Sequence, residues 1–197
     1  FRRMFHVLDG NRDYTSILNA RSRQRLHDLL QDAEKKGARI IRSSDETISD
    51  GSFRMAMHLV TRVSDEMKIM QEELLGPILP LLPYDNIDEA LAYVNRRPRP
   101  LALYLFTYDK LLQERVTYHT HAGSMCINEA LLQVAIDDLP FGDIGPSGMG
   151  HYHGHEGFLS MSKAKAILSK GKFNSMKFIY PPYGGFVQKW LTRWLIR

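Results

Sequence analysis

The chain contains 197 residues, of which 44% are hydrophobic and 24% are charged. This balance is typical of a folded globular protein and excludes disorder as the main state. Cys126 is the only cysteine, which excludes a disulfide-stabilised scaffold and a structural zinc site built from several thiolates. No apolar run approaches the roughly 18 residues that span a bilayer, and no signal peptide is recognisable. A lone thiol suits a reducing compartment, so we expect a cytoplasmic protein.

The net charge of +4 is unevenly distributed along the chain. Residues 157–197 hold eight basic residues and no acidic one, whereas the preceding residues hold 18 basic and 22 acidic ones. A basic tail can face nucleic acid or an anionic membrane. Because no RNA-binding or DNA-reading pattern accompanies the charge, we expect no nucleic-acid partner and favour a solvated face or a contact with an acidic neighbour. The change in charge predicts a boundary between residues 1–157 and residues 158–197.

Apolar spacing and turn residues predict these elements in chain order: a helix over residues 22–36, strands over residues 39–42 and 58–63, a helix over about residues 86–95, a strand over residues 101–107, a helix over about residues 109–117 and a strand over residues 124–128. Gly37 can end the first helix. Asn86 and Glu89 have the spacing of a capping box for the second helix, and Asp109 can cap the third. The unbroken apolar run at residues 101–107 is expected of a strand that is covered on both faces. Alternating helices and strands predict an α/β fold with a mostly parallel sheet flanked by helices.

The last residues, 186–197, predict a terminal amphipathic helix. An apolar stripe at helical spacing includes Trp190 and Trp194, and the basic residues lie mostly off that stripe. Such a helix can lie on a membrane surface or pack against a neighbouring domain or subunit. Packing is the favoured interpretation, and membrane-surface contact by the tail is the alternative.

Three local patterns suggest chemistry, and for each a structural interpretation is favoured. Residues 140–150 are rich in glycine but lack the lysine of a P-loop, and Pro146 removes a phosphate donor, so a tight turn is expected. The histidines in residues 151–155 alternate, but no carboxylate cluster accompanies them, so no metal site is expected. Cys126 lies in a predicted buried strand without a neighbouring base, where a thiol is inert.

The pair Glu72 and Glu73 precedes a Leu-Leu-Gly-Pro turn. A carboxylate can accept hydrogen bonds from both hydroxyls of a ribose, which makes such a residue a candidate for nucleotide binding. Taken alone, a surface pair before a turn is the simpler interpretation.

Two segments together resemble the aldehyde dehydrogenase superfamily. They are residues 71–77, Gln-Glu-Glu-Leu-Leu-Gly-Pro, and residues 140–150, Pro-Phe-Gly-Asp-Ile-Gly-Pro-Ser-Gly-Met-Gly. Residues 101–106 and 152–154 resemble the class 3-like branch of that family. Further segments resemble the bacterial coniferyl aldehyde dehydrogenases within it: residues 13–19, 25–26, 151–158, 162–166 and 181–184. The resemblance covers nearly the whole chain.

The resemblance implies oxidation of an aldehyde to a carboxylic acid with NAD or NADP, here an aromatic or other hydrophobic aldehyde similar to coniferyl aldehyde. In such enzymes a cysteine thiolate attacks the carbonyl, hydride passes to the nicotinamide, and a glutamate base assists hydrolysis of the thioester. The resemblance puts that cysteine, that glutamate and the cofactor domain upstream of this chain. No catalytic residue is therefore assigned here, and Cys126 is not the nucleophile. We expect a C-terminal portion, inactive alone, that works with a missing N-terminal part; a first residue Phe1 instead of methionine agrees with this.

Site residues follow from the resemblance by position. Glu73 matches the carboxylate that holds the nicotinamide ribose, and Leu75 stands where the family has a phenylalanine that contacts the ring. Phe141 matches an aromatic residue that lines the aldehyde tunnel, and it is expected to face Glu73 across a shared cavity. Asp143 replaces a usual glycine, so the local turn can differ. The weaker substrate-binding candidates are Asn128, Leu131, Val134, Tyr152 and His153.

The resemblance also implies a role for the C-terminal tail. Residues 163–169 correspond to a strand of the family's oligomerisation sheet, which implies a homodimer. Residues 1–157 are then a partial catalytic domain, and residues 158–197 hold the oligomerisation strand and the basic tail. Two rival interpretations are a non-catalytic binding or assembly module that keeps the fold, and a membrane-surface protein driven by the basic helix.

Overall fold

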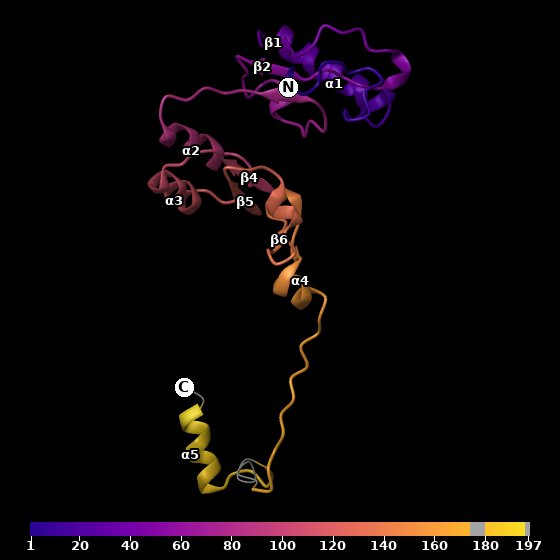
Figure 1. Cartoon of the computed structure of the whole chain (residues 1–197). Helices are drawn as coiled ribbons and strands as arrows, with labels where there is room; N and C mark the ends of the chain where they lie inside the picture. Colours follow the sequence, from indigo (N-terminus) through magenta and orange to yellow (C-terminus); the bar gives the residue numbers. More distant parts are fainter. Residues whose placement is uncertain (174–179, 196–197) are drawn as a thin grey trace. The chain divides into compact units, whose positions relative to one another are not determined.

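A computed structural model of the chain describes residues 1–173 and 180–195 (Figure 1). The chain divides into two compact units, Phe1–Val94 and Asn95–Arg197, and each is described by itself. Within the described ranges, no helix combines the length and the apolar character needed to cross a bilayer. The boundary predicted at residue 157 falls within the second unit and stays a prediction.

The first unit contains a three-stranded sheet. Its elements are α1 (Ala20–Lys35), β1 (Arg39–Arg42), the 3₁₀ helices η1 (Asp50–Ser52) and η2 (Lys68–Met70), β2 (His58–Thr61), β3 (Ile78–Pro80) and α2 (Ile87–Asn95), which ends where the second unit begins. β1 pairs antiparallel with β2, and β2 pairs parallel with β3. The predicted helices and strands of this part are confirmed within a few residues. β3 was not expected, because three residues that include a proline give little strand signal.

Helix α1 is capped at both ends and buries one face. Asn19 Oδ1 accepts a hydrogen bond from the Ser22 N–H at 2.8 Å, so the helix begins before the predicted residue 22. At the other end Gly37 takes a φ of 94°, and the Ala38 N–H donates to the Ala33 carbonyl at 2.9 Å, as in a Schellman motif. The buried core joins this face to the sheet and η2: Leu26, Leu29, Leu30, Ala33, Ala38, Met55, Val60, Met67, Ile69 and Ile78. This packing sets the face of α1 that contacts the segment after η2.

The second unit begins with a strand–helix–strand unit. Its elements are β4 (Ala102–Leu105), α3 (Lys110–His119), β5 (Ser124–Ile127), η3 (Leu132–Ala135), β6 (Phe141–Gly142), η4 (Gly145–Ser147), β7 (His151–Tyr152), α4 (Gly154–Ser160) and α5 (Phe186–Leu195). β4 and β5 are parallel, with α3 as the crossover, whereas β6 and β7 are antiparallel. Asp109 caps α3 as predicted, because its Oδ1 accepts from the N–H groups of Leu111 at 3.0 Å and Leu112 at 3.2 Å.

Two sheet predictions are wrong for the described residues. The strands form three small sheets, one mixed, one parallel and one antiparallel, instead of one mostly parallel sheet. Two parallel strands need a long crossover between them. The glycine-rich link between β6 and β7 is too short for such a crossover, so these strands pair antiparallel. The strand near residues 101–107 is also not covered on both faces, since Tyr104 is 37% and Phe106 67% exposed.

The strand predicted at residues 163–169 is absent from the described structure, where residues 162–171 form no helix or strand. Ile167 and Leu168 are 79% and 96% exposed. A strand exists only through hydrogen bonds to a neighbouring strand, and none of the strands described for this chain pairs with these residues. The homodimer that this strand implied therefore stays a proposal.

Candidate functional site

The segment that carries Glu73 runs between η2 and β3 and is held by α1. Arg25 donates from Nη1 to the Glu73 carbonyl oxygen at 3.1 Å and from Nη2 to the Leu74 carbonyl oxygen at 2.5 Å. Its Nη1 also lies 3.7 Å from Glu72 Oε2. Because a guanidinium presents several N–H donors in one rigid plane, a single arginine can hold two successive carbonyls. Arg25 therefore fixes the backbone that positions Glu73.

A second side chain of α1 fixes the start of the same segment. Asp32 Oδ2 accepts a hydrogen bond from the N–H of Lys68, the first residue of η2, at 2.8 Å. Asp32 Oδ1 lies 2.9 Å from Lys36 Nζ, which also donates to the Glu66 carbonyl at 2.7 Å. The Lys68 N–H, followed by the Lys36 ammonium, lowers the pKa of Asp32 below its ordinary value. Asp32 and Arg25 lie about two helical turns apart on one face of α1, so one helix anchors both parts of the segment.

The backbone turns sharply directly after Glu73 and Leu74. Leu75 has a φ of 50°, in the left-handed region that is costly for a residue other than glycine. Gly76 packs directly on the buried Leu26, where an added Cβ would overlap the leucine side chain. The Leu75 side chain is 74% exposed. The turn thus leaves Leu75 open to a ligand while Gly76 is seated on the core.

A cavity of about 490 Å³ lies beside this turn. It is lined by Ile17, Leu18, Ser22, Arg25, Glu72, Glu73 and Leu75. Within the described residues the Glu73 carboxylate has no hydrogen-bond or ion-pair partner, so both of its oxygens can accept from a ligand. The lining therefore combines an acceptor for two hydroxyl groups with apolar surface, the combination that a ribose with an attached ring needs.

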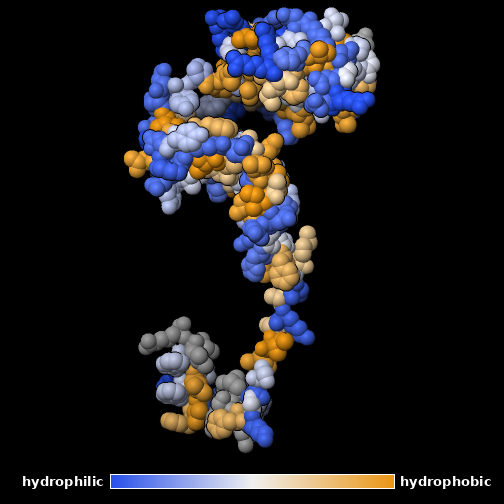
Figure 2. Space-filling view, in the orientation of Figure 1, coloured by the Kyte–Doolittle hydropathy of each residue, from blue (hydrophilic) through white to orange (hydrophobic). Residues whose placement is uncertain are grey.

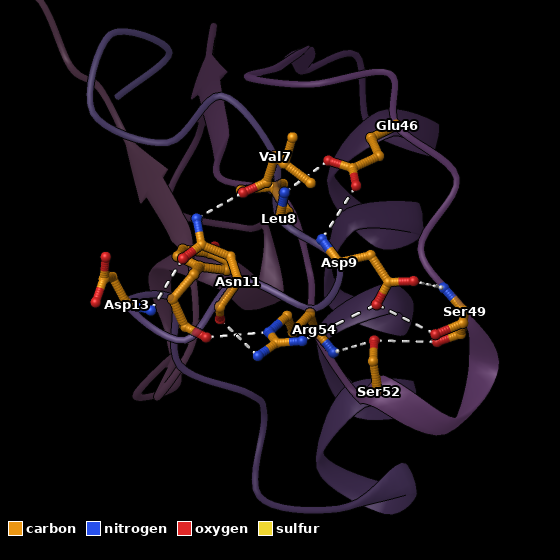
Figure 3. A network of polar contacts seen from close by, with 10 residues as sticks. Val7, Leu8, Asp9, Asn11, Asp13, Glu46, Ser49, Ser52 and Arg54 are labelled. Atoms are coloured by element: carbon orange, nitrogen blue, oxygen red, sulfur yellow. Dashed lines mark hydrogen bonds and ion pairs between the residues drawn. The ribbon is translucent and has the colours of Figure 1, made fainter.

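The stretch that leads into α1 is held by a polar network (Figure 3). Asp9 accepts hydrogen bonds from the hydroxyl of Ser49 at 3.1 Å and from its N–H at 3.2 Å, and these bonds lower the pKa of Asp9. Arg54 donates to the carbonyls of Tyr14 at 3.0 Å and Asn11 at 2.6 Å and lies 4.0 Å from Asp9. The network fixes the residues that precede the apolar wall of the cavity.

Three of the predicted substrate residues come together in the second unit. Phe141 on β6 stands opposite Tyr152 on β7, and their rings meet edge to face with centroids 5.6 Å apart. The ring of His153 lies 4.4 Å from that of Tyr152. His153 Nδ1 is buried and has no hydrogen-bond partner within the described residues. The hairpin thus forms one aromatic cluster that encloses a polar atom without a partner among the described residues.

The glycine-rich residues 140–150 form the tight turn that the sequence predicts. At Gly142 an added Cβ would overlap the Gly150 carbonyl, so the two backbone segments touch directly. The Asp143 N–H donates to the same carbonyl at 3.1 Å. The Asp143 carboxylate lies over Gly148, which has no side chain to block it. The unusual Asp143 is therefore accommodated inside the turn.

The other substrate candidates lie apart from the aromatic cluster in the chain. Asn128 Oδ1 accepts from the Thr107 N–H at 2.8 Å, and its Nδ2 donates to the Thr107 carbonyl at 2.9 Å. The amide thus extends the pairing of β4 and β5, a structural use of this side chain. Leu131 and Val134 belong to the segment around η3 and are 68% and 36% exposed.

Backbone strain coincides with the predicted site residues. Among the described residues, six that are not glycine have positive φ: Phe53, Arg62, Leu75, Asn128, Leu131 and His153. Four of these six are candidates for cofactor or substrate binding. Each such conformation costs on the order of 1–3 kcal/mol and persists only where the surroundings impose it, which happens most often at functional sites.

Among the described residues, the remaining candidate groups do not come together into a metal site or a catalytic site. No group of three or more His, Cys, Asp or Glu side chains that could hold a metal occurs among the described residues. His155 stacks on Phe158 with ring centroids 6.5 Å apart. Cys126 lies half-buried on β5, in register with Tyr104.

Comparison with known proteins decides the family. The model of the aldehyde dehydrogenase family matches residues 3–167. The chain belongs to the aldehyde dehydrogenase family. It is 53% identical over 98% of its length to a probable coniferyl aldehyde dehydrogenase of Pseudomonas aeruginosa, and 42% identical over 92% to a coniferyl aldehyde dehydrogenase of a Pseudomonas species. It covers 40% and 38% of those relatives, respectively.

Solved structures of aldehyde dehydrogenases agree with this assignment. A substrate-bound AldH of Staphylococcus aureus matches 93% of the chain with a TM-score of 0.76 and 35% identity, and the match covers 39% of that protein. An aldehyde dehydrogenase of Mycobacterium tuberculosis in complex with NAD⁺ matches 82% of the chain with a TM-score of 0.72 and 25% identity, and the match covers 33% of it. The family is one of NAD(P)-dependent oxidoreductases.

Within this aldehyde dehydrogenase chain, Glu73 and Leu75 lie in the first unit, and the six substrate candidates lie in the second. Sequence reasoning named Glu73 and Leu75 but gave no role to Arg25 or Asp32. The sequence signal available for these two residues was their placement on one face of the first predicted helix. That signal alone does not reveal that the segment after η2 crosses this face.

Proposed function

We propose that this chain is the C-terminal portion of an NAD(P)-dependent aldehyde dehydrogenase that oxidises an aromatic or other hydrophobic aldehyde, of the coniferyl aldehyde type, to its carboxylic acid. The observation that carries the proposal is the segment fixed by α1, which presents the Glu73 carboxylate, unpaired among the described residues, beside an open cavity. The nucleophilic cysteine and the base belong to polypeptide that this chain does not contain. We accordingly expect the chain to be inactive by itself.

The cofactor role follows from the chemistry of the cavity. The Glu73 carboxylate accepts hydrogen bonds from the two ribose hydroxyls, Arg25 holds the backbone beneath it, and Leu75 covers one face of the attached ring. When bound, the nicotinamide supplies the hydride acceptor. Fixing the ribose restricts the ring to orientations from which reaction is possible, and such positioning contributes much of the rate in enzymes.

The substrate role rests on the aromatic cluster. Phe141 and Tyr152 offer the edge and face of two rings to an aromatic aldehyde, and the His153 ring packs against Tyr152. Leu131 and Val134 add apolar surface at the mouth of the tunnel. Asn128 acts indirectly, because it holds the backbone of Thr107. The intact enzyme works as a homodimer in which residues 163–169 pair with the partner.

Exchange of the carboxylate for an amide tests the cofactor role. In the intact enzyme, Glu73→Gln keeps the shape but loses one of the two strong acceptors. We expect a single-turnover rate of hydride transfer at least about ten-fold lower, corresponding to one charge-assisted hydrogen bond, with little change in aldehyde binding. Glu72→Gln is the matched control, since Glu72 faces Arg25 at 3.7 Å. Unchanged single-turnover kinetics in Glu73→Gln would reject the assignment.

Loss of an aromatic ring tests the substrate role. Phe141→Ala should lower kcat/KM for aromatic aldehydes more than for short aliphatic ones, because only the former contact the ring. Steady-state kinetics with a series of aldehydes measures this preference. Equal losses for every aldehyde would contradict a place for Phe141 in the substrate pocket. A non-catalytic module would show no aldehyde oxidation in the intact protein at all.

A further inference from the structure

Helix α5 separates apolar and basic side chains onto two sides. One side holds Phe186, Val187, Trp190, Leu191 and Trp194. The other side holds Gln188, Lys189, Thr192 and Arg193. Figure 2 shows the hydrophobic residues gathered along one side of this helix. A short helix with Trp and Phe on one side and Lys and Arg on the other has the pattern of helices that lie in a membrane interface.

The apolar side of α5 is open. Phe186, Trp190 and Trp194 are 86%, 61% and 73% exposed. The start of the helix is held by a hydrogen bond within the same segment, because the Gly184 N–H donates to Gln188 Oε1 at 2.7 Å. Two exposed tryptophans on one short helix are rare in a protein surface that faces only water.

The chain before α5 adds positive charge. No acidic residue occurs between residues 157 and 197. The described residues 162–171 form no helix or strand, and they carry Lys163, Lys165 and Lys170 beside Ile167 and Leu168, which are 79% and 96% exposed. Basic residues with exposed apolar neighbours are attracted to anionic lipid headgroups. The charge of the segment therefore complements a negative surface.

We propose that α5 binds the surface of an anionic lipid bilayer. The apolar side with Trp190 and Trp194 inserts at the boundary between headgroups and acyl chains, and Lys189 and Arg193 contact the headgroups. The helix lies in the plane of the surface, because its 10 residues extend only about 15 Å and a hydrocarbon core is about 30 Å thick. This places an enzyme for hydrophobic aldehydes at a surface where such substrates concentrate. That benefit rests on the proposed function, whereas the binding experiment does not depend on it.

Vesicle flotation of the intact protein tests the proposal. The probes are vesicles of phosphatidylcholine alone and vesicles of equal parts phosphatidylcholine and phosphatidylglycerol. We expect flotation with the anionic vesicles only, and weaker flotation when salt rises from about 0.1 M to about 1 M, since the Debye length then falls from roughly 10 Å to 3 Å. Lys189→Gln with Arg193→Gln should lower the partition coefficient by about five-fold for each charge removed. The matched control, Arg12→Gln with Arg21→Gln, removes two exposed charges from the first unit and should float like the wild type.

The apolar contribution is tested separately. Trp190→Ser with Trp194→Ser should abolish flotation, whereas Trp190→Leu with Trp194→Leu should retain much of it, because leucine also inserts into the interface. Aldehyde oxidation and size-exclusion chromatography report whether each variant is folded. Wild-type protein that ignores anionic vesicles, or charge variants that float as well as the wild type, would overturn the proposal. Loss of the native oligomer in the serine variant, with no wild-type flotation, would show that α5 packs on protein instead.

Discussion

Arg25 offers the sharpest test of how the cofactor segment is held. Arg25→Gln removes the guanidinium that binds the carbonyl oxygens of Glu73 and Leu74 and lies 3.7 Å from Glu72. Hydrogen bonds from a charged group are each worth about 1.5–3 kcal/mol, and exposure to water reduces this. The ion pair adds little, because its side chains are 36% and 49% exposed. We expect a net loss of about 2 kcal/mol in the stability of this segment, and a weakening of cofactor binding by at most the same amount, or roughly 30-fold in Kd.

Isothermal titration of the intact enzyme with NAD⁺ and NADP⁺ measures this loss. Arg21→Gln is the matched control, since it removes an exposed arginine from the same helix. The KM for the aldehyde should change little in either variant, because Arg25 belongs to the cofactor side of the site. Equal affinity for the cofactor in Arg25→Gln and Arg21→Gln would refute the reasoning that the segment depends on this clamp.

Three further changes have defined outcomes. Gly76→Ala should destabilise the protein by about 1–3 kcal/mol in chemical denaturation, because its Cβ overlaps Leu26, and Leu26→Val should recover part of that loss in a double-mutant cycle. Leu75→Phe should tighten NAD⁺ binding, measured by titration, since a larger ring face covers more of the ligand; weaker binding would argue against Leu75 as a cofactor contact. Burial, together with nearby Arg42 and His27, lowers the pKa of His58 below 6.5. As the pH falls, the unfolded state therefore binds a proton at this histidine at a higher pH than the folded state does. Stability should therefore fall as the pH drops through 6.5 towards the folded-state pKa, by at most about 1.4 kcal/mol per pH unit, and His58→Gln should flatten this slope in thermal denaturation.

Among the described residues, local sequence signals predicted four of the five α-helices and four of the seven strands, and they missed α4, β3, β6 and β7. Apolar spacing and end signals act within a few residues, so Gly37 and Asp109 mark the ends of α1 and α3 as expected. Sheet assembly depends on contacts distant in sequence, and the run of alternating elements gave no information about them. The prediction of one mostly parallel sheet failed for that reason. Strands as short as β6 and β7 exist only because a glycine turn brings them together, which periodicity does not reveal.

The candidate site was predicted in part for the same physical reason. Glu73 and Phe141 could be named because each lies within a continuous motif. Arg25 and Asp32 act on residues more than thirty positions away, so no local pattern connects them with the cofactor segment. Asn128 was expected to face substrate, but its amide is engaged with Thr107, a contact set by the parallel register of β4 and β5. Its assignment as a direct substrate contact stays untested.

A crystal structure of the intact enzyme with bound NAD⁺ tests the central claim most directly. We expect the Glu73 carboxylate to accept hydrogen bonds from the two hydroxyls of the nicotinamide ribose, at about 2.5–3.0 Å, with Arg25 still bound to the carbonyls beneath it. A nicotinamide ribose held by other residues, with Glu73 facing solvent, would contradict the account.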